Sequence, residues 1–188
     1  MTTIFVGGSR RVSRLDAAVR GRLDTIMEKH FPVIVGDANG ADRAVQRYLH
    51  DRGYQQVEVF CSGTDPRNNL GHWQIRQIRV APRDKGFRFY VAKDRAMARE
   101  ADFGLMIWDG KSTGTLLNVL RLLRQEKKVV LYDVPGHRVL DLKTGDDWRD
   151  FAAALDPELR GEMERKADIE ERSHGTTEQA TLLPMALG

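Results

Sequence analysis

The chain repeats one local arrangement: a short apolar run, then a turn rich in glycine or hydroxyl residues, then apolar residues at helical spacing. Five runs rich in β-branched and aromatic residues are predicted to be strands: Thr2–Val6, Val33–Val35, Val57–Phe60, Phe103–Ile107 and Val129–Tyr132. Strands that alternate with helices are joined by right-handed crossovers and therefore form a parallel sheet. The sequence thus predicts an α/β fold, a three-layer sandwich in which helices cover both faces of a mostly parallel sheet of five or slightly more strands.

The composition predicts one folded domain with an extension. The 188 residues are 41% hydrophobic, which is enough for a sizeable core. We expect the main domain over residues 1–135 and a C-terminal extension over residues 136–188. No apolar run approaches the roughly 20 residues of a membrane-spanning helix, and no basic leader precedes the first strand, so the protein is expected to be cytoplasmic, without a membrane partner. The single cysteine, Cys61, excludes an internal disulfide and is expected to be a buried thiol.

Charge is distributed unevenly along the chain. Residues 1–140 carry 24 Lys and Arg against 15 Asp and Glu, whereas residues 141–188 carry 6 against 12. A basic body favours an anionic small molecule or a nucleic acid as ligand, while the alternative is that these charges form ordinary solvated faces.

Three turns follow the carboxyl ends of predicted strands, and such turns share one rim of a parallel sheet. They lie at residues 7–10, 36–42 and 109–115. The third, within Trp108–Thr115, leads into a helix whose free amides and dipole favour an anion, so we predict that it holds the phosphate of a nucleotide-like ligand. The candidate ligand-binding residues in the three turns are Gly7, Gly8, Ser9, Arg10, Gly36, Asn39, Gly40, Asp42, Asp109, Gly110, Lys111, Ser112, Gly114 and Thr115.

Two acidic residues and a lysine extend this candidate set. Asp42, in the first turn of a predicted helix, either complements the helix dipole or accepts a hydrogen bond from a ribose hydroxyl or a ligand amine. Lys93 and Asp94 are predicted to lie near the start of another helix. A cation opposes the dipole there, which suggests a nearby anion or carboxylate, and Lys93 is therefore a candidate ligand-binding residue.

The segment 61–92 interrupts the alternation of strands and helices. It is expected to be a long insertion, with a possible short strand at Phe87–Val91. Its cations and its tryptophan either form a lid over a nucleotide or, in the case of Trp73, anchor the loop to the core. The lid residues would be Arg67, Trp73, Arg76 and Arg79.

The C-terminal extension changes in character along its length. Arg138–Leu142 is predicted to add a strand and Asp146–Leu155 a helix. The acidic remainder is expected to form a helix or an arm against a second subunit, or else to be frayed. Its apolar end, Leu182–Met185, would suit a homodimer interface.

Four motifs occur in order along the chain, as Gly7-Gly8-Ser9-Arg10, Gly40-Ala41-Asp42-Arg43, Asp94–Met97 followed by Ala101-Asp102, and Trp108–Thr115. Together they resemble the SLOG superfamily of Rossmann-like domains, which includes the DNA-processing Smf proteins and the Lonely-guy phosphoribohydrolases. Within it they resemble a small bacterial and phage branch, over roughly residues 3–132. The resemblance implies a Rossmann-like domain that binds nucleotides or nucleotide-derived ligands, with phosphate on Gly110–Thr115, and it implies a homo-oligomer.

One departure from that pattern separates binding from catalysis. The phosphoribohydrolase relatives have a catalytic glutamate three residues after the Gly-Thr pair, where this chain has Asn118. An amide cannot exchange a proton as a carboxylate does, so we predict nucleotide binding or sensing. The alternative is an N-glycosidic enzyme, phosphoribohydrolase or deoxyribosyltransferase, that uses a carboxylate from another turn, Asp42, Asp94 or Asp109, with Asp94 and Asp109 as the catalytic candidates. Single-stranded nucleic-acid binding is the third interpretation.

Metal binding has little support in the sequence. The five histidines are scattered, with no pair at ligand spacing, and no metal site is predicted from them. A Mg²⁺ ion that accompanies a phosphate through Asp109 or Ser112 is left as an alternative.

Overall fold

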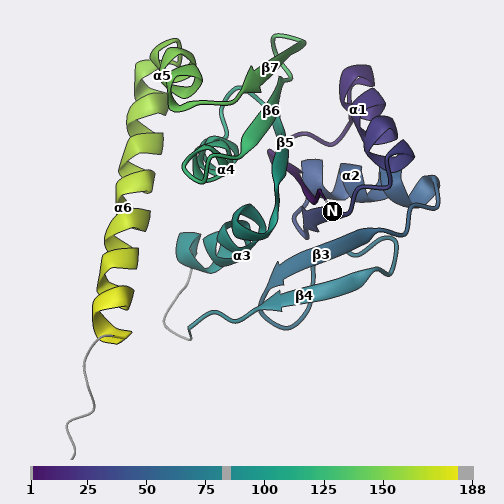
Figure 1. The fold of residues 1–188 in the computed structure, drawn as a ribbon, viewed down its shortest axis with the longest axis horizontal. Coiled ribbons are helices and arrows are strands. Elements are labelled where there is room, and N and C mark those ends of the chain that lie inside the picture. Colours follow the sequence, from purple (N-terminus) through teal and green to yellow (C-terminus); the bar gives the residue numbers. More distant parts are fainter. Residues whose placement is uncertain (1, 82–85, 182–188) are drawn as a thin grey trace, which may run out of the picture.

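All five expected strands form in a computed structural model of the protein, which describes residues 2–81 and 86–181 (Figure 1). Over these residues seven strands make one sheet, in the order β4-β3-β2-β1-β5-β6-β7. Neighbouring strands are parallel except β6 and β7, so the predicted α/β fold is confirmed. The strands are β1 Ile4–Gly8, β2 Val33–Gly36, β3 Val57–Ser62, β4 Gln74–Ile78, β5 Phe103–Trp108, β6 Lys128–Asp133 and β7 Arg138–Leu142.

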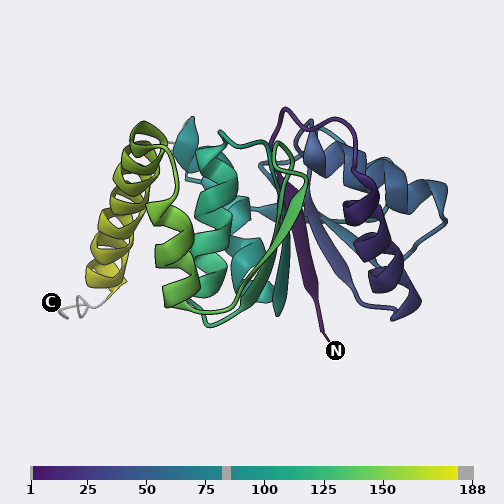
Figure 2. The same cartoon turned by 90° about the horizontal axis from the view of Figure 1, so that it is seen from above.

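Helices cover both faces of the sheet (Figure 2). In the described residues they are α1 Ala17–Glu28, α2 Ala41–Asp51, α3 Phe87–Glu100, α4 Thr113–Leu123, α5 Gly145–Ala153 and α6 Pro157–Thr181. Neighbouring side chains of β1 point to opposite faces: Val6 packs in the cluster that contains α1 and α2, and Phe5 in the cluster that contains α3 and α4. Burial on both faces explains why the central strands are apolar throughout.

The strand order reverses between β1 and β5. From β1 the chain runs to β2 and β3 on one side, whereas β5 and β6 lie on the other side of β1. The loops after β1 and β5 therefore lead to helices on opposite faces, α1 on one and α4 on the other. Ligands of open α/β sheets bind at the carboxyl ends of the strands at such a switch point. In this fold that position is formed by the loops after Gly8 and Trp108.

The expected strand at Phe87–Val91 is wrong, because these residues begin helix α3. Aromatic and β-branched residues favour strands only where the neighbouring packing suits a strand, and here the helix packs against β2, β3 and α4. The strand that does form in this region, Gln74–Ile78, was missed. It is a mostly exposed edge strand that pairs with β3, so its polar sequence carries no alternating apolar signal.

The side chains between β3 and α3 are tied to the sheet. Trp73 is buried, and its Nε1 donates to the carbonyl of Tyr54 at 2.9 Å. Arg67 makes a two-pronged ion pair with Asp37, at 2.9 and 2.7 Å. Trp73 is therefore an anchor, the second of the two alternatives for this residue, and closure of the segment over a ligand stays a prediction.

The C-terminal extension packs on the same chain. Strand β7 and helix α5 form at the predicted places. Helix α6 lies outside α4, where Met163 and Ala167 are buried in the same core cluster as α4 residues (Figure 2). A second subunit is thus not needed to cover this face of α6. The apolar segment Leu182–Met185 lies outside the described residues, and the homodimer stays a prediction.

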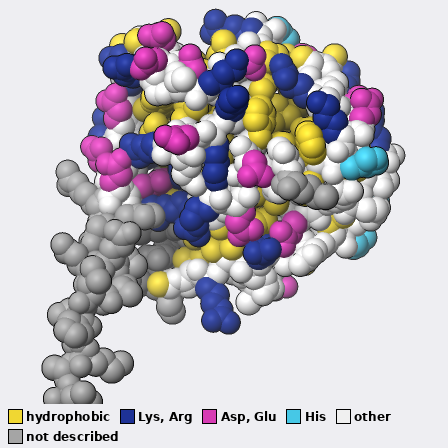
Figure 3. All heavy atoms as spheres, viewed as in Figure 1, with side chains coloured by type: hydrophobic (Ala, Val, Ile, Leu, Met, Phe, Trp, Pro, Cys, Tyr) yellow, Lys and Arg dark blue, Asp and Glu magenta, His cyan; other side chains and the backbone are white. Residues whose placement is uncertain are grey.

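The face seen in Figure 3 carries hydrophobic side chains near its centre, with basic and acidic side chains around them.

A cavity of about 260 Å³ lies where β1 and β5 begin, with mostly apolar residues such as Ile4, Phe31 and Val130 in its wall. Its polar residues are Thr2, Arg22, Thr25 and Lys29, and none of the predicted site residues lines it. No helix among the described residues combines the length and apolar character needed to cross a membrane.

Candidate functional site

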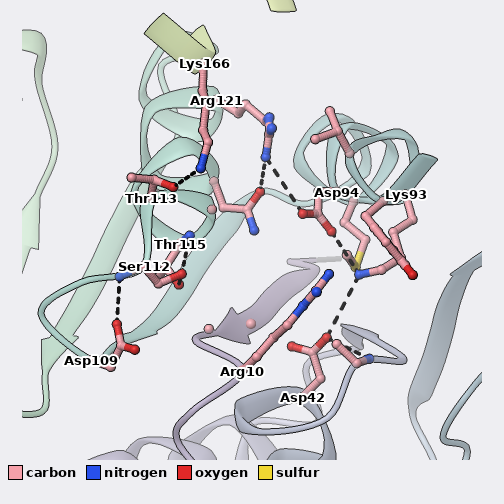
Figure 4. A pocket seen from close by; sticks show the side chains of 18 of the residues that line it. Arg10, Asp42, Lys93, Asp94, Asp109, Ser112, Thr113, Thr115, Arg121 and Lys166 are labelled. Atoms are coloured by element: carbon pink, nitrogen blue, oxygen red, sulfur yellow. Dashed lines mark hydrogen bonds and ion pairs between the residues drawn. The ribbon is translucent and has the colours of Figure 1, made fainter. Parts of the chain in front are cut away.

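A cavity of about 540 Å³ opens at the carboxyl ends of β1 and β5, at the switch point of the sheet (Figure 4). Its volume lies in the range of pockets that bind small molecules and cofactors. Predicted site residues in its wall are Gly7, Gly8, Arg10, Asp42, Lys93, Asp94, Asp109, Lys111, Ser112, Gly114 and Thr115. The three predicted turns thus meet at one rim and together supply half of the residues in this wall, with Ala38 and Asp42 as the contribution of the turn at residues 36–42.

The loop between β5 and α4 is held by its own side chains. Asp109 Oδ1 accepts hydrogen bonds from the amides of Lys111 and Ser112, at 3.0 and 2.7 Å, and from the Ser9 hydroxyl at 3.0 Å. Gly110 adopts a φ of 80°, a left-handed conformation that favours glycine. Asp109 therefore has a positioning role in this loop, which its sequence context did not reveal.

The first turn of α4 keeps two amides for a ligand. Ser112 caps the helix by accepting a hydrogen bond from the Thr115 amide at 3.3 Å. The next two amides toward the helix start, those of Thr113 and Gly114, make no hydrogen bond within the described part of the chain. Both residues line the cavity at a helix N-terminus, where the dipole favours negative charge. This half of the predicted phosphate loop has the chemistry of an anion site.

Hydroxyl groups connect the two sides of the switch point. The Ser9 hydroxyl after β1 lies 3.1 Å from the Thr115 hydroxyl, which donates to the Ser112 hydroxyl at 3.0 Å. Ser9 is buried under the wall of the cavity and does not line it. Its role is to hold the loop after β1 against the start of α4.

Four charged groups form a buried cluster at the other side of the cavity. Lys93 Nζ lies 2.9 Å from Asp94 and 4.0 Å from both Asp42 and Asp37. Lys93 and Asp94 are in the second turn of α3 and not at its start, because the helix begins at Phe87. The anion inferred from the unfavourable position of Lys93 is thus a set of carboxylates of this chain. Burial lowers the pKa of Lys93, but the carboxylates outweigh burial and raise it.

Asp42 is the buried carboxylate of this cluster that also lines the cavity. Burial raises the pKa of Asp42 to about 6, although the Lys93 ammonium opposes the shift. A Cβ on Gly36 would lie 2.3 Å from Asp42 Oδ2 and 2.6 Å from Lys93 Nζ. Gly36 therefore does not line the cavity but makes room for the ion pair beneath it.

The remaining predicted residues lie beside the cavity. A Cβ on Gly40 would lie 2.2 Å from the carbonyl oxygen of Arg10, so this glycine permits close packing of two of the turns. Asn39 accepts a hydrogen bond from Asn68 at 3.1 Å, and with Gly40 it lines a neighbouring groove. Gly110 shapes its own loop against Pro135.

The structure adds residues to the site that the sequence did not suggest. Thr113 and Arg121 come from α4, Tyr90 from α3, and Lys166 from α6. Two guanidinium groups contact the Tyr90 ring, with the Cζ atoms of Arg10 and Arg67 4.8 and 5.0 Å from the ring centroid. Lys166 belongs to the acidic extension, far in sequence from every turn motif. It reaches the cavity because α6 packs on α4.

Charge differs between the two sides of the cavity (Figure 4). Lys166 lies near the start of α4 with Thr113, whereas Asp42, Lys93 and Asp94 group on the opposite side. The Arg10 side chain extends into the cavity beside Asp42. In the whole wall six basic side chains face three acidic ones. The cavity therefore suits a ligand that carries an anionic group at the end near α4 and hydrogen-bond donors at the end near Asp42.

The described residues hold no group of three His, Cys, Asp or Glu side chains that could bind a metal ion. Asp109 Oδ1, one of the oxygens considered for Mg²⁺, already accepts three hydrogen bonds. A Mg²⁺ ion that enters with a phosphate stays an untested alternative.

Comparison with known proteins bears on the fold. No family model and no curated protein matches the chain. Among solved structures, DNA processing protein A from Helicobacter pylori matches with a TM-score of 0.55 at 14% identity, over 89% of this chain and 80% of that one. That protein was described for its mode of binding single-stranded DNA. At this identity the similarity shows the shared Rossmann-like α/β fold alone, and the superfamily and its branch stay predictions from the motifs.

Proposed function

We propose that the cavity binds a phosphorylated ribonucleotide or a closely related ligand. The observation that carries the proposal is the pairing, in one cavity, of a helix start with two open amides and a buried carboxylate on the opposite side. The amides of Thr113 and Gly114 would receive phosphate oxygens, with Lys166 beside them. Asp42 would accept a hydrogen bond from a sugar hydroxyl.

The engagement of the polar groups favours binding over catalysis. Asp109 is occupied in holding its loop, and Asp94 is paired with Lys93 at 2.9 Å. Asn118, in the position of the relatives' glutamate, accepts a hydrogen bond from Arg121. The carboxylates of Asp94 and Asp109 thus already have partners within the protein, which supports a binding protein. The glycosidase interpretation stays a prediction, and release of free base from a nucleotide would be its direct sign.

Unfolding temperatures measured with nucleotides test the proposed function. We expect AMP at a hundredfold excess over its Kd to stabilise the protein by about 2.7 kcal/mol. Adenosine at the same concentration should give a much smaller shift, because it lacks the phosphate. Loss of a charged hydrogen bond costs about 1.5–3 kcal/mol, so 2′-deoxy-AMP or 3′-deoxy-AMP should bind roughly tenfold or more weakly than AMP.

The Asp42→Asn variant is the control for the sugar contact. It should bind AMP and the weaker of the two deoxy analogues with nearly equal affinity, because the amide no longer discriminates strongly for the hydroxyl. No shift of the unfolding temperature with any nucleoside monophosphate, purine or pyrimidine, would refute the proposed function.

A second candidate function rests on a groove beside the cavity. We define the arginine groove by four basic residues that line a depression beside α1 and α2, which are Arg14, Arg20, Arg43 and Arg47. In the described part of the chain none of the four forms an ion pair, and one acidic residue, Asp51, lines the groove. Arg43 and Arg47 stand four residues apart on α2, a spacing at which like charges repel. Arginines without an ion-pair partner suit the phosphates of a nucleic-acid strand, and the single-stranded DNA bound by the structural neighbour supports this candidate.

Binding of a fluorescent oligo(dT) at several salt concentrations tests the groove. Each phosphate contact contributes about −0.7 to the slope of log K against log salt for single strands. We expect the double variant Arg43→Gln and Arg47→Gln to lower this slope in magnitude by about 1.4 and to leave AMP binding unchanged. An unchanged slope would exclude the groove as the nucleic-acid site.

A further inference from the structure

Helix α6 reaches the cavity through Lys166. Its ammonium donates to the hydroxyl of Thr113 at 2.7 Å and to Glu162 one turn earlier on α6. Thr113 is the first residue of α4, and its amide is one of the two that remain open. A phosphate on these amides would therefore lie beside a cation that comes from the C-terminal extension.

Helix α6 also holds an arginine of the cavity wall. Glu170 accepts from Arg121 Nε at 3.1 Å and from its Nη2, which makes a two-pronged pair. The third guanidinium nitrogen, Nη1, donates to Asn118 and lies 4.0 Å from Asp94. One edge of the guanidinium thus contacts α6, and the opposite edge faces the cavity.

The pair is buried, with 9% of the Arg121 side chain and 11% of the Glu170 side chain exposed. Such a pair adds little net stability, because desolvation of both charges offsets their attraction. It does fix the plane and direction of the guanidinium. Met163, Lys166, Ala167 and Glu170 follow at helical spacing, so one face of α6 both packs on α4 and serves the cavity.

We infer that α6 is part of the ligand site, with Lys166 as a phosphate contact and Glu170 as the positioning residue of Arg121. The inference rests on the proposed function and adds a consequence to it. Ligand binding and the docking of α6 on α4 are thermodynamically linked. If phosphate binding requires Lys166 and Arg121, a bound phosphate stabilises the docking of α6 by the same free energy by which docked α6 strengthens phosphate binding. The C-terminal helix then reports whether the cavity is filled.

The test combines calorimetry with amide hydrogen exchange on the full chain, and AMP and adenosine are the probes. With AMP, and not with adenosine, exchange of residues 157–171 should slow. Glu170→Gln should weaken AMP binding at least tenfold while adenosine binding changes less than twofold, and Glu170→Asp should restore part of the loss. A role in stability alone would not change the ratio of AMP to adenosine affinity.

The neighbouring residue provides a matched control. Glu171 also pairs with an arginine of α4, Arg124, but both of these side chains are about half exposed, at 58% and 48%. Glu171→Gln should leave AMP affinity and exchange unchanged. Lys166→Met serves as a second variant, should Glu170→Gln fail to fold, and it should weaken AMP binding selectively.

The outcomes separate the two proposals. If the unchanged protein binds AMP but Glu170→Gln and Lys166→Met bind it equally well, or exchange of α6 does not respond, the role of α6 is wrong and the proposed function stands. If the unchanged protein binds no nucleotide, both proposals fall.

Discussion

Replacement of Lys93 by methionine is expected to destabilise the protein by about 3–5 kcal/mol near pH 8, as happens when one partner of a buried ion pair is removed. Lys93 is 4% exposed and stands within 4.0 Å of three carboxylates. Without the ammonium, Asp42 and Asp94 would stay as buried or half-buried charges with no cation between them. Urea unfolding at several pH values measures the effect.

The destabilisation caused by Lys93→Met should become smaller as the pH falls. Burial already raises the pKa of Asp42 to about 6 in the folded protein, from 3.8 in the unfolded chain, and loss of Lys93 would raise it further. The folded state thus binds the proton more tightly, so stability declines as the pH rises through the folded pKa and returns as the pH is lowered. We expect the gap between the Lys93→Met variant and the unchanged protein to narrow from pH 8 toward pH 5.

Asp42→Asn provides the comparison for this cluster. It should cost less than about 1 kcal/mol near pH 8, because it removes a buried charge and leaves Lys93 paired with Asp94 and Asp37. Added to Lys93→Met, it should recover part of the lost stability. An equal loss at pH 5 and pH 8 would contradict the ionic origin of the effect.

A methyl group on Gly8 is expected to be nearly as damaging, at about 3 kcal/mol or more. The added Cβ would lie 2.3 Å from the carbonyl oxygen of Ile107, and the backbone of the two central strands cannot move aside without breaking their pairing. Thermal unfolding of Gly8→Ala measures the loss. This glycine is needed for the close approach of β1 and β5, at the wall of the cavity.

Two other glycines are the controls. On Gly7 a Cβ would lie 3.0 Å from the edge of the buried Phe5 ring, a contact that a displacement of a few tenths of an ångström relieves, so Gly7→Ala should cost about 1 kcal/mol, well below Gly8→Ala. A Cβ on Gly21, inside α1, would meet no atom within 4 Å, and Gly21→Ala should stabilise the protein by about 0.5–1 kcal/mol. If Gly8→Ala were tolerated as well as Gly7→Ala, the stated packing of β1 on β5 would be wrong.

The fold could be predicted from the sequence because its main signals are local. Each central strand is a short apolar run, buried on both faces, and each ends in a recognisable turn. The switch point follows from the strand order, however, and no single run shows where β5 will pair. The edge strand Gln74–Ile78 was missed because an exposed strand needs no apolar pattern.

Most predicted residues that line the cavity belong to those turns, and Lys93 and Asp94 were predicted separately, from an expected helix start that lies elsewhere in the structure. Gly7, Asp42 and Ser112 were found because they follow strands that end at one rim. Arg121 and Lys166 were not, since the first looks like an ordinary cation near a helix C-terminus and the second lies in an acidic helix. Their place at the cavity depends on how α6 packs against α4, which is a tertiary contact without a local signature.

The central claim is that the start of α4 binds the ligand's phosphate. The most direct measurement follows the amide resonances of Thr113 and Gly114 by NMR during separate titrations with AMP and adenosine. The account predicts that AMP shifts both resonances strongly and that adenosine leaves them nearly unchanged. Shifts confined to amides of the arginine groove, such as those of Arg43 and Arg47, with Thr113 and Gly114 unaffected at saturating AMP, would contradict it.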